Sequence, residues 1–232
     1  ALEACPEISS VEQFRAARRC LQIFGIKRLR EELVQERFLD GETGLLTNKL
    51  QPFNFFARLA AGLTSQLSSR VLQAKLGEYQ DRYLIACNRT EAELMWESED
   101  SAWLGKAGLA KRHVMMTVKD LHWEWFNVLT FGLISGIEVG LEKLRQMRDA
   151  AVQWAEGMEE WPSGEDLGLF VCCSPMTRAK AMQLHILDMT SPGPSFLRFR
   201  HNYLDLDSAI EALEIELHES FEKVWLRSII SV

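Results

Sequence analysis

The chain has 232 residues, of which 47% are hydrophobic and 25% are charged, and its formal net charge at pH 7 is −7. This composition is typical of a folded globular protein and excludes an intrinsically disordered chain. No apolar run reaches the ~20 residues of a membrane-spanning helix, so we expect no membrane span. Nucleic-acid binding requires a concentrated basic face, so the negative charge argues against nucleic acid as the main partner.

The prolines and the apolar periodicity together predict a mainly helical fold. Residues 53–161 contain no proline, and since proline interrupts helix interiors, a long helical block is expected there. Apolar residues recur at three- and four-residue spacing in the expected helices. These helices begin near Ser9, Pro52, Thr90, Leu109, Ser174 and Ser208. Gly25 breaks the phase of the first run, and one long helix or two abutting ones are expected over roughly 52–88. After Leu109, one clean apolar face consists of Leu141, Leu144, Met147, Ala151, Trp154, Met158 and Trp161.

We therefore predict a mainly α fold, a bundle of about seven or eight helices that forms a single domain over residues 1–232. A short, unperiodic apolar run predicts a strand near 167–173, and a second strand near 196–204 is an option. The loop at 190–195 contains two prolines and a glycine, which leaves open a C-terminal subdomain or appendage.

The first helical region is basic, and one face of the last helix is acidic. The basic residues are Arg15, Arg18, Arg19, Lys27, Arg28 and Arg30, and the acidic ones are Glu211, Glu214, Glu219 and Glu222. We expect ion pairs between these helices, within one chain or between subunits; contact with an acidic partner is the alternative.

The segment 126–141 is apolar apart from Glu138 and places Gly132, Gly136 and Gly140 four residues apart. On a single helix these glycines share one face, where another backbone or a flat ligand can approach closely. Each interior glycine costs a helix about 1 kcal/mol, which the contact must offset. We expect a central helix whose glycine face packs against protein, with a ligand wall or an oligomer seam as alternatives.

The segment from Gly132 to Gly140 is similar to the glycine-containing distal helix of heme oxygenases, in which missing side chains let the backbone approach a flat tetrapyrrole. This resemblance implies a helical small-molecule or tetrapyrrole-binding protein, or an enzyme, of heme-oxygenase-like architecture. The iron-ligating histidine of that family lies in the first helix, whereas the first histidine here is His113. We therefore predict no cofactor.

No motif indicates catalytic or metal chemistry. The Gly-x-Ser-x-Gly elbow and the phosphate-binding loop are absent. Glu214 and His218 are one helical turn apart, but a metal site requires a second such pair, so no metal is predicted. The five cysteines include no Cys-x-x-Cys, which is typical of free thiols in a reducing compartment. We expect an intracellular protein, cytoplasmic or nuclear, without catalytic residues; the chain starts at Ala1, so a removed leader stays open.

The tryptophans indicate where a partner binds. Trp123 and Trp125 are two residues apart and point in different directions on a helix, so one of them should lie near the surface. Trp96 and Trp103 flank an acidic loop, and exposed aromatic rings contribute strongly to protein binding. The predicted partner or ligand surface consists of Trp96, Trp103, Trp123, Trp125, Gly132, Gly136 and Gly140.

The resulting expectation is a non-catalytic interaction or regulatory protein. It would bind a protein partner, or itself as a homo-oligomer, through a hydrophobic groove or face. The alternatives are the small-molecule or tetrapyrrole-binding protein described above and an assembly subunit of matrix or capsid type.

Overall fold

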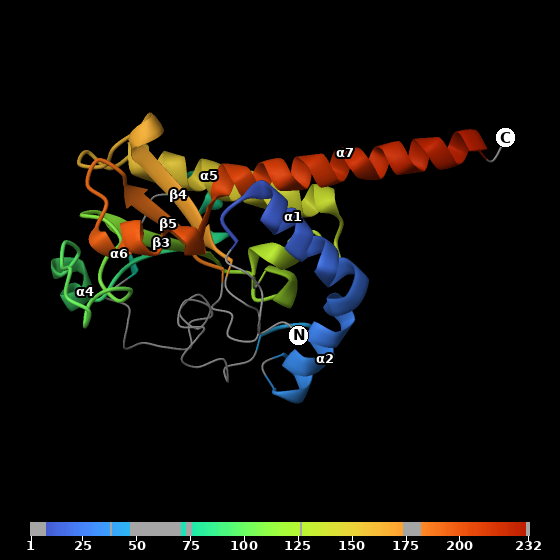
Figure 1. Ribbon diagram of the computed structural model, residues 1–232, viewed down its shortest axis with the longest axis horizontal. Helices are drawn as coiled ribbons and strands as arrows, with labels where there is room; N and C mark the ends of the chain where they lie inside the picture. Colours follow the sequence, from blue (N-terminus) through green and yellow to red (C-terminus); the bar gives the residue numbers. More distant parts are fainter. Residues whose placement is uncertain are drawn as a thin grey trace.

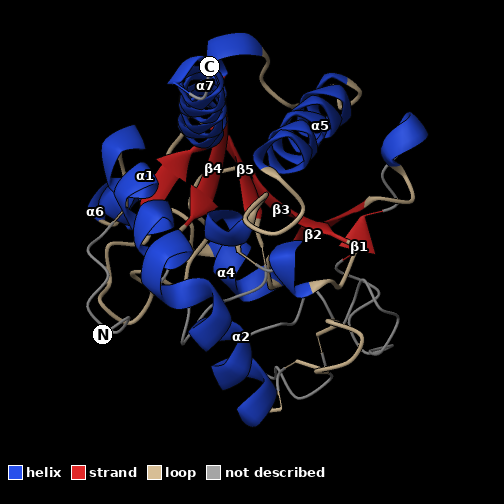
Figure 2. Cartoon of the chain, turned by 90° about the vertical axis from the view of Figure 1, so that its right-hand side faces the viewer, coloured by secondary structure: helices blue, strands red, loops and turns tan. Residues whose placement is uncertain are grey.

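A computed structural model describes residues 8–37, 39–46, 71–72, 76–125, 127–173 and 182–230. In these residues two long helices cover one face of an antiparallel sheet (Figures 1 and 2). The predicted mainly α bundle is therefore wrong, and so is the all-α classification. The prediction that residues 1–232 form a single domain is not tested by the structure and stays a prediction.

Within the described residues the sheet has six strands in the order β1-β2-β3-β5-β4-β6, and all neighbours are antiparallel. The strands are β1 (Val71–Leu72), β2 (Tyr83–Cys87), β3 (His113–Val118), β4 (Leu167–Cys172), β5 (Leu184–Asp188) and β6 (Tyr203–Asp205). Successive side chains on a strand point to opposite faces. On β3, Val114, Met116 and Val118 therefore share a face and belong to the main hydrophobic core, whereas His113 lies on the other.

Helices α5 (Ile137–Glu156) and α7 (Leu206–Ile230) lie side by side above the sheet in Figure 2. The predicted apolar face is confirmed within α5, where Leu141, Leu144, Met147, Ala151 and Trp154 are buried. Its last two members, Met158 and Trp161, lie beyond the end of the helix, and Met158 is exposed. Helix α7 extends well beyond the sheet in Figure 1. The short helices α4 (Thr90–Leu94) and α6 (Pro194–Arg198) lie at the end of the molecule away from the C-terminus.

The N-terminal helical region consists of α1 (Val11–Cys20), a π-helical turn η2 (Leu21–Gly25) and α2 (Ile26–Gln35). Ser10 caps α1, because its side chain accepts a hydrogen bond from the Gln13 amide. A π turn inserts an extra residue into the helical repeat, so the predicted break of phase at Gly25 is confirmed.

Ion pairs join α1 to α7 within one chain, as the charge pattern predicted, although one of them uses Glu216, which the predicted acidic face did not include. Arg15 pairs with Glu219, and Arg18 pairs with Glu216 at 3.0 Å. Arg18 is fully buried, and its Nη1 also donates to the backbone oxygens of Leu129 and Phe131 at 3.0 and 2.7 Å. A buried charge needs partners for all its polar atoms. Arg18 therefore fixes how α1, α7 and the segment 129–131 pack together.

The prediction of helix is wrong where the chain forms strands β2 and β3. β2 and β3 lie inside the expected helical ranges, and all six residues of β3 are buried. Apolar runs that are buried on both faces do not alternate, so periodicity alone cannot distinguish them from helix. Much of the expected helices at 52–88 and after Ser174 lies outside the described residues.

The strand predicted near 167–173 is confirmed as β4. The second predicted strand, near 196–204, is confirmed only at its end. There the chain forms α6, a 3-10 turn η9 (Arg200–Asn202) and then β6.

Candidate functional site

The three glycines of the predicted site do not share a helix face. The chain forms a 3-10 turn η6 (Val128–Thr130), then an irregular turn, and enters α5 only at Ile137. Gly132 has a φ of +71° and Gly136 a φ of +105°, and such values are incompatible with a right-handed helix. The predicted central glycine helix over 126–141 is therefore wrong.

Gly132 and Gly140 nevertheless bring two backbones together. A Cβ on Gly140 would lie 2.6 Å from the Gly132 nitrogen and 2.8 Å from its Cα. Gly136 is exposed, and a Cβ there would meet nothing within 4 Å. The glycines thus let the turn fold back onto the first turns of α5, and the buried pair contacts the chain itself.

A buried carboxylate holds the same turn in place. Glu124, which is 2% exposed, accepts hydrogen bonds through Oε1 from the Ile134 amide at 3.0 Å, the Ser135 amide at 2.9 Å and the Ser135 hydroxyl at 2.9 Å. Buried carboxylates are stable only with such partners. Glu124 belongs to the 3-10 turn η5 (Trp123–Trp125), so the tryptophans and the turn before α5 form one unit.

The four tryptophans of the predicted surface lie in two places. Trp123 and Trp125 flank Glu124 and are buried, and the Trp125 ring packs edge-on against Phe131 with centroids 5.2 Å apart. Trp96 and Trp103 are half-buried beside or beyond α4. The structure therefore brings Trp125 and the glycine turn together, and it does not bring Trp96 and Trp103 to them.

Trp125 lines a cleft between the end of the β2–β3 pair and the N-terminal half of α5, which we call the tryptophan cleft. Its volume is about 540 Å³. Tyr83, Trp125 and Val139 supply its apolar surface, and Val139 is 48% exposed. Burial raises the pKa of Tyr83, so its hydroxyl stays protonated and donates to the Lys143 backbone oxygen at 3.3 Å.

Charged residues of both signs form the rim of the tryptophan cleft. Lys143 lies 4.0 Å above the Trp125 ring and pairs with Asp120 at 3.1 Å. Arg82 donates to the Gln146 side chain at 2.6 Å, and Lys119 to the Gln80 backbone oxygen at 2.7 Å. In the described ranges neither Arg82 nor Lys119 forms an ion pair, so both charges are available to a ligand.

A second cleft lies at the other end of α5, and none of the residues predicted as functional borders it. We call it the arginine cleft, after Arg112; its volume is about 410 Å³. His113 lines it and shares a hydrogen bond of 3.0 Å with His185. These histidines are 72 positions apart in the chain, so only the pairing of β3 with β5 brings them together. The signal in the sequence was a histidine at the start of one short apolar run and a second histidine inside another.

Across the described portion of the chain, no group of three or more His, Cys, Asp or Glu side chains is arranged to hold a metal ion. No helix in that portion has the length and apolar character needed to cross a membrane. Comparisons with protein-family models, curated proteins and solved structures each find no match.

Proposed function

We propose that this chain is a protein-binding module and that the tryptophan cleft receives a peptide segment of its partner. The observation that supports this most is the half-exposed Val139 beside Trp125 in a cleft large enough for a side chain. A well-packed aromatic wall bordered by polar groups is typical of the centre of a protein interface.

The rim suggests the chemistry of the peptide. Arg82 and Lys119 have neutral hydrogen-bond partners, so a carboxylate of the ligand would gain a charge-assisted bond. Glu142 accepts a hydrogen bond from the neutral Gln146 side chain, which leaves its charge for a basic residue of the ligand. The expected peptide therefore has an apolar side chain for the wall, with an acidic and a basic residue near it.

Peptides selected from a displayed random library against the full chain would test this proposal. We expect them to share an apolar residue between charged ones and to bind Val139→Asp about tenfold more weakly or worse, which corresponds to the loss of one strong contact. Val139 is the third residue of α5, where an acidic side chain is compatible with the helix dipole, so the variant should fold.

The matched control is Leu197→Asp, which makes the same change at an apolar residue that is 63% exposed and outside the cleft. It should leave binding unchanged. Peptides that bind wild type and Val139→Asp equally well would contradict the proposal. So would a loss of binding in Leu197→Asp of the same size.

A further inference from the structure

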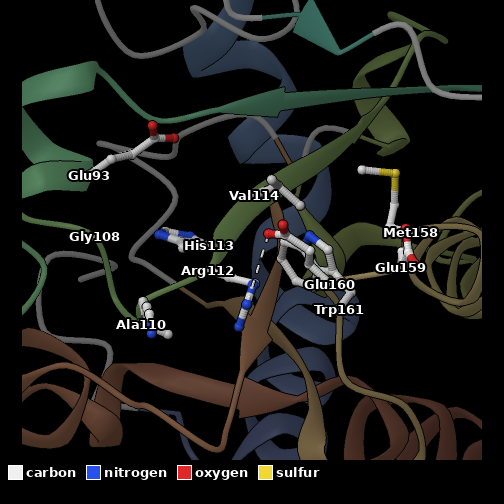
Figure 3. A pocket seen from close by; sticks show the side chains of 11 residues that line it. Glu93, Gly108, Ala110, Arg112, His113, Val114, Met158, Glu159, Glu160 and Trp161 are labelled. Atoms are coloured by element: carbon white, nitrogen blue, oxygen red, sulfur yellow. Dashed lines mark ion pairs between the residues drawn. The ribbon is translucent and has the colours of Figure 1, made fainter.

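The arginine cleft has a different construction from the tryptophan cleft. It lies between the start of β3 and the segment that follows α5. Figure 3 shows Glu93 and His113 on one side, Met158 and Trp161 on the other, and Arg112 between them. Trp161 packs edge-on against Trp154 with centroids 4.7 Å apart, so the apolar wall is anchored in the main core.

A buried carboxylate fixes the inner edge of the Arg112 guanidinium. Arg112 Nη1 lies 2.7 Å from Asp188 Oδ2, and Asp188 is 1% exposed. The other oxygen of Asp188 accepts hydrogen bonds from the Thr190 hydroxyl at 2.5 Å and the Thr190 amide at 3.0 Å. Burial raises the pKa of Asp188, but the bonds from Thr190 and Arg112 outweigh burial and hold the pKa below its ordinary value. Arg112 is therefore held in one orientation without any ligand.

The outer edge of the same guanidinium is only loosely occupied. Arg112 Nη2 lies 3.9 Å from Glu160 Oε2, which is beyond hydrogen-bond distance, and the Glu160 side chain is 84% exposed (Figure 3). Exposed ion pairs of this kind contribute little to stability. An anion with better geometry can therefore take the place of Glu160 at little cost.

His113 borders this position as an uncharged group. The Leu109 amide donates to His113 Nδ1 at 3.2 Å, and an amide can only donate, so the His113 proton lies on Nε2 and points to His185 Nδ1. Burial, and then the neighbouring His185, lower the pKa of His113 well below its usual value. The imidazole therefore does not compete with Arg112 for an anion. Glu93 lies on the far side of the cleft, and its carboxylate accepts a bond from the Asn88 amide at 3.0 Å.

We propose that the arginine cleft binds a small organic anion, a carboxylate or phosphate monoester joined to an apolar or aromatic group. The anionic group displaces Glu160 from the outer edge of Arg112, and the apolar group lies against Trp161 and Met158. Lys111, which is exposed at the cleft, adds a second positive charge. This site is separate from the tryptophan cleft and does not depend on the function proposed for it.

Titrations of the ¹⁵N-labelled full chain with benzoate, phenyl phosphate and inorganic phosphate test this proposal. Saturable shifts of the Trp161 indole signal are expected with phenyl phosphate or benzoate, and the tighter of the two identifies the anionic group. Inorganic phosphate lacks the apolar part and should bind at least about tenfold more weakly. The absence of any saturable shift with both aromatic probes would overturn the proposal.

Three variants determine whether Arg112 and Glu160 act as proposed. Arg112→Gln should weaken binding about tenfold or more. Glu160→Gln removes the competing anion and should strengthen binding about two- to fivefold, a change of sign that a merely structural role would not give. Glu156→Gln alters the same charge at an exposed residue outside the cleft and should have no effect. Weaker binding in Glu160→Gln would overturn the proposal even if Arg112→Gln does not fold.

Discussion

The two ends of helix α5 border clefts that are built in different ways. At the N-terminal end the chain is shaped by its backbone, because Gly132 and Gly140 approach closely and Glu124 accepts bonds from the turn between them. At the C-terminal end the geometry depends on side chains, namely the Arg112–Asp188 pair and the hydrogen-bonded His113 and His185. The close backbone contact of Gly132 with Gly140 leaves no room for an added atom. The side chains at the C-terminal end can instead change their hydrogen-bond partners.

This difference relates directly to what each cleft can bind. The tryptophan cleft has a rigid apolar wall and a rim of both charges, which suits a side chain of a peptide. The arginine cleft has one fixed cation with a loosely held counter-ion, which suits a small anion that replaces it. The two proposals can therefore be tested separately on one protein.

The largest effect is expected from adding a methyl group at the N-terminal end of α5. The Cβ of Gly140→Ala would lie within 2.8 Å of backbone atoms of Gly132, which cannot move aside as a side chain can. We expect the free energy of unfolding to fall by about 3 kcal/mol or more in urea titrations, at the upper end of overpacking costs. The tryptophan cleft should be lost with it.

Gly136→Ala is the matched control for that change. Its Cβ would meet nothing within 4 Å, but the φ of +105° is strained for alanine. We expect a loss of about 1–2 kcal/mol, smaller than for Gly140→Ala. Equal losses, or the reverse order, would show that the close approach of Gly132 and Gly140 does not hold this end together.

A smaller effect, confined to the C-terminal end, is expected from acid. The pKa of His113 is lowered in the folded protein, by burial first and by His185 second. Below the unfolded pKa of about 6.5, the unfolded state then binds more protons than the native state. Stability should therefore fall as the pH falls from 7 towards 5.5, by at most about 1.4 kcal/mol per pH unit for this group.

The test compares urea unfolding of wild type and His113→Asn across that range. The asparagine oxygen can still accept from the Leu109 amide but does not titrate. The variant should lose some stability at pH 7 and show a flatter dependence on pH. An unchanged slope would mean that His113 is not the group responsible.

Local signals in the sequence were sufficient for several helices. The break of phase at Gly25, the apolar face of α5 and the charge pairing of α1 with α7 all depend on residues close together on one helix or on simple complementarity. Strands β2 and β3 were missed because they are short and mostly buried, so their polar and apolar residues do not alternate. The glycine spacing was misleading because three positions four apart fit a helix and a glycine-rich turn equally well.

Only part of the candidate sites could be predicted, for a related reason. Trp123 and Trp125 are both buried in the main core, and Trp125 also lines the tryptophan cleft; that a partner binds there stays a prediction. Arg112, Asp188 and His185 meet only because β3 pairs with β5. Contacts that depend on which strands pair cannot be predicted from the sequence until the order of the strands is known.

The most direct test of the proposed peptide-binding function is a map of where a library-selected peptide binds. In ¹⁵N spectra of the full chain, the indole signals of Trp125 and Trp161 can be assigned with Trp125→Phe and Trp161→Phe. We expect the peptide to shift the Trp125 signal and the amides around Arg82 and Lys119, and to leave Trp161 unchanged. A peptide that shifts Trp161 and leaves Trp125 unchanged would contradict it.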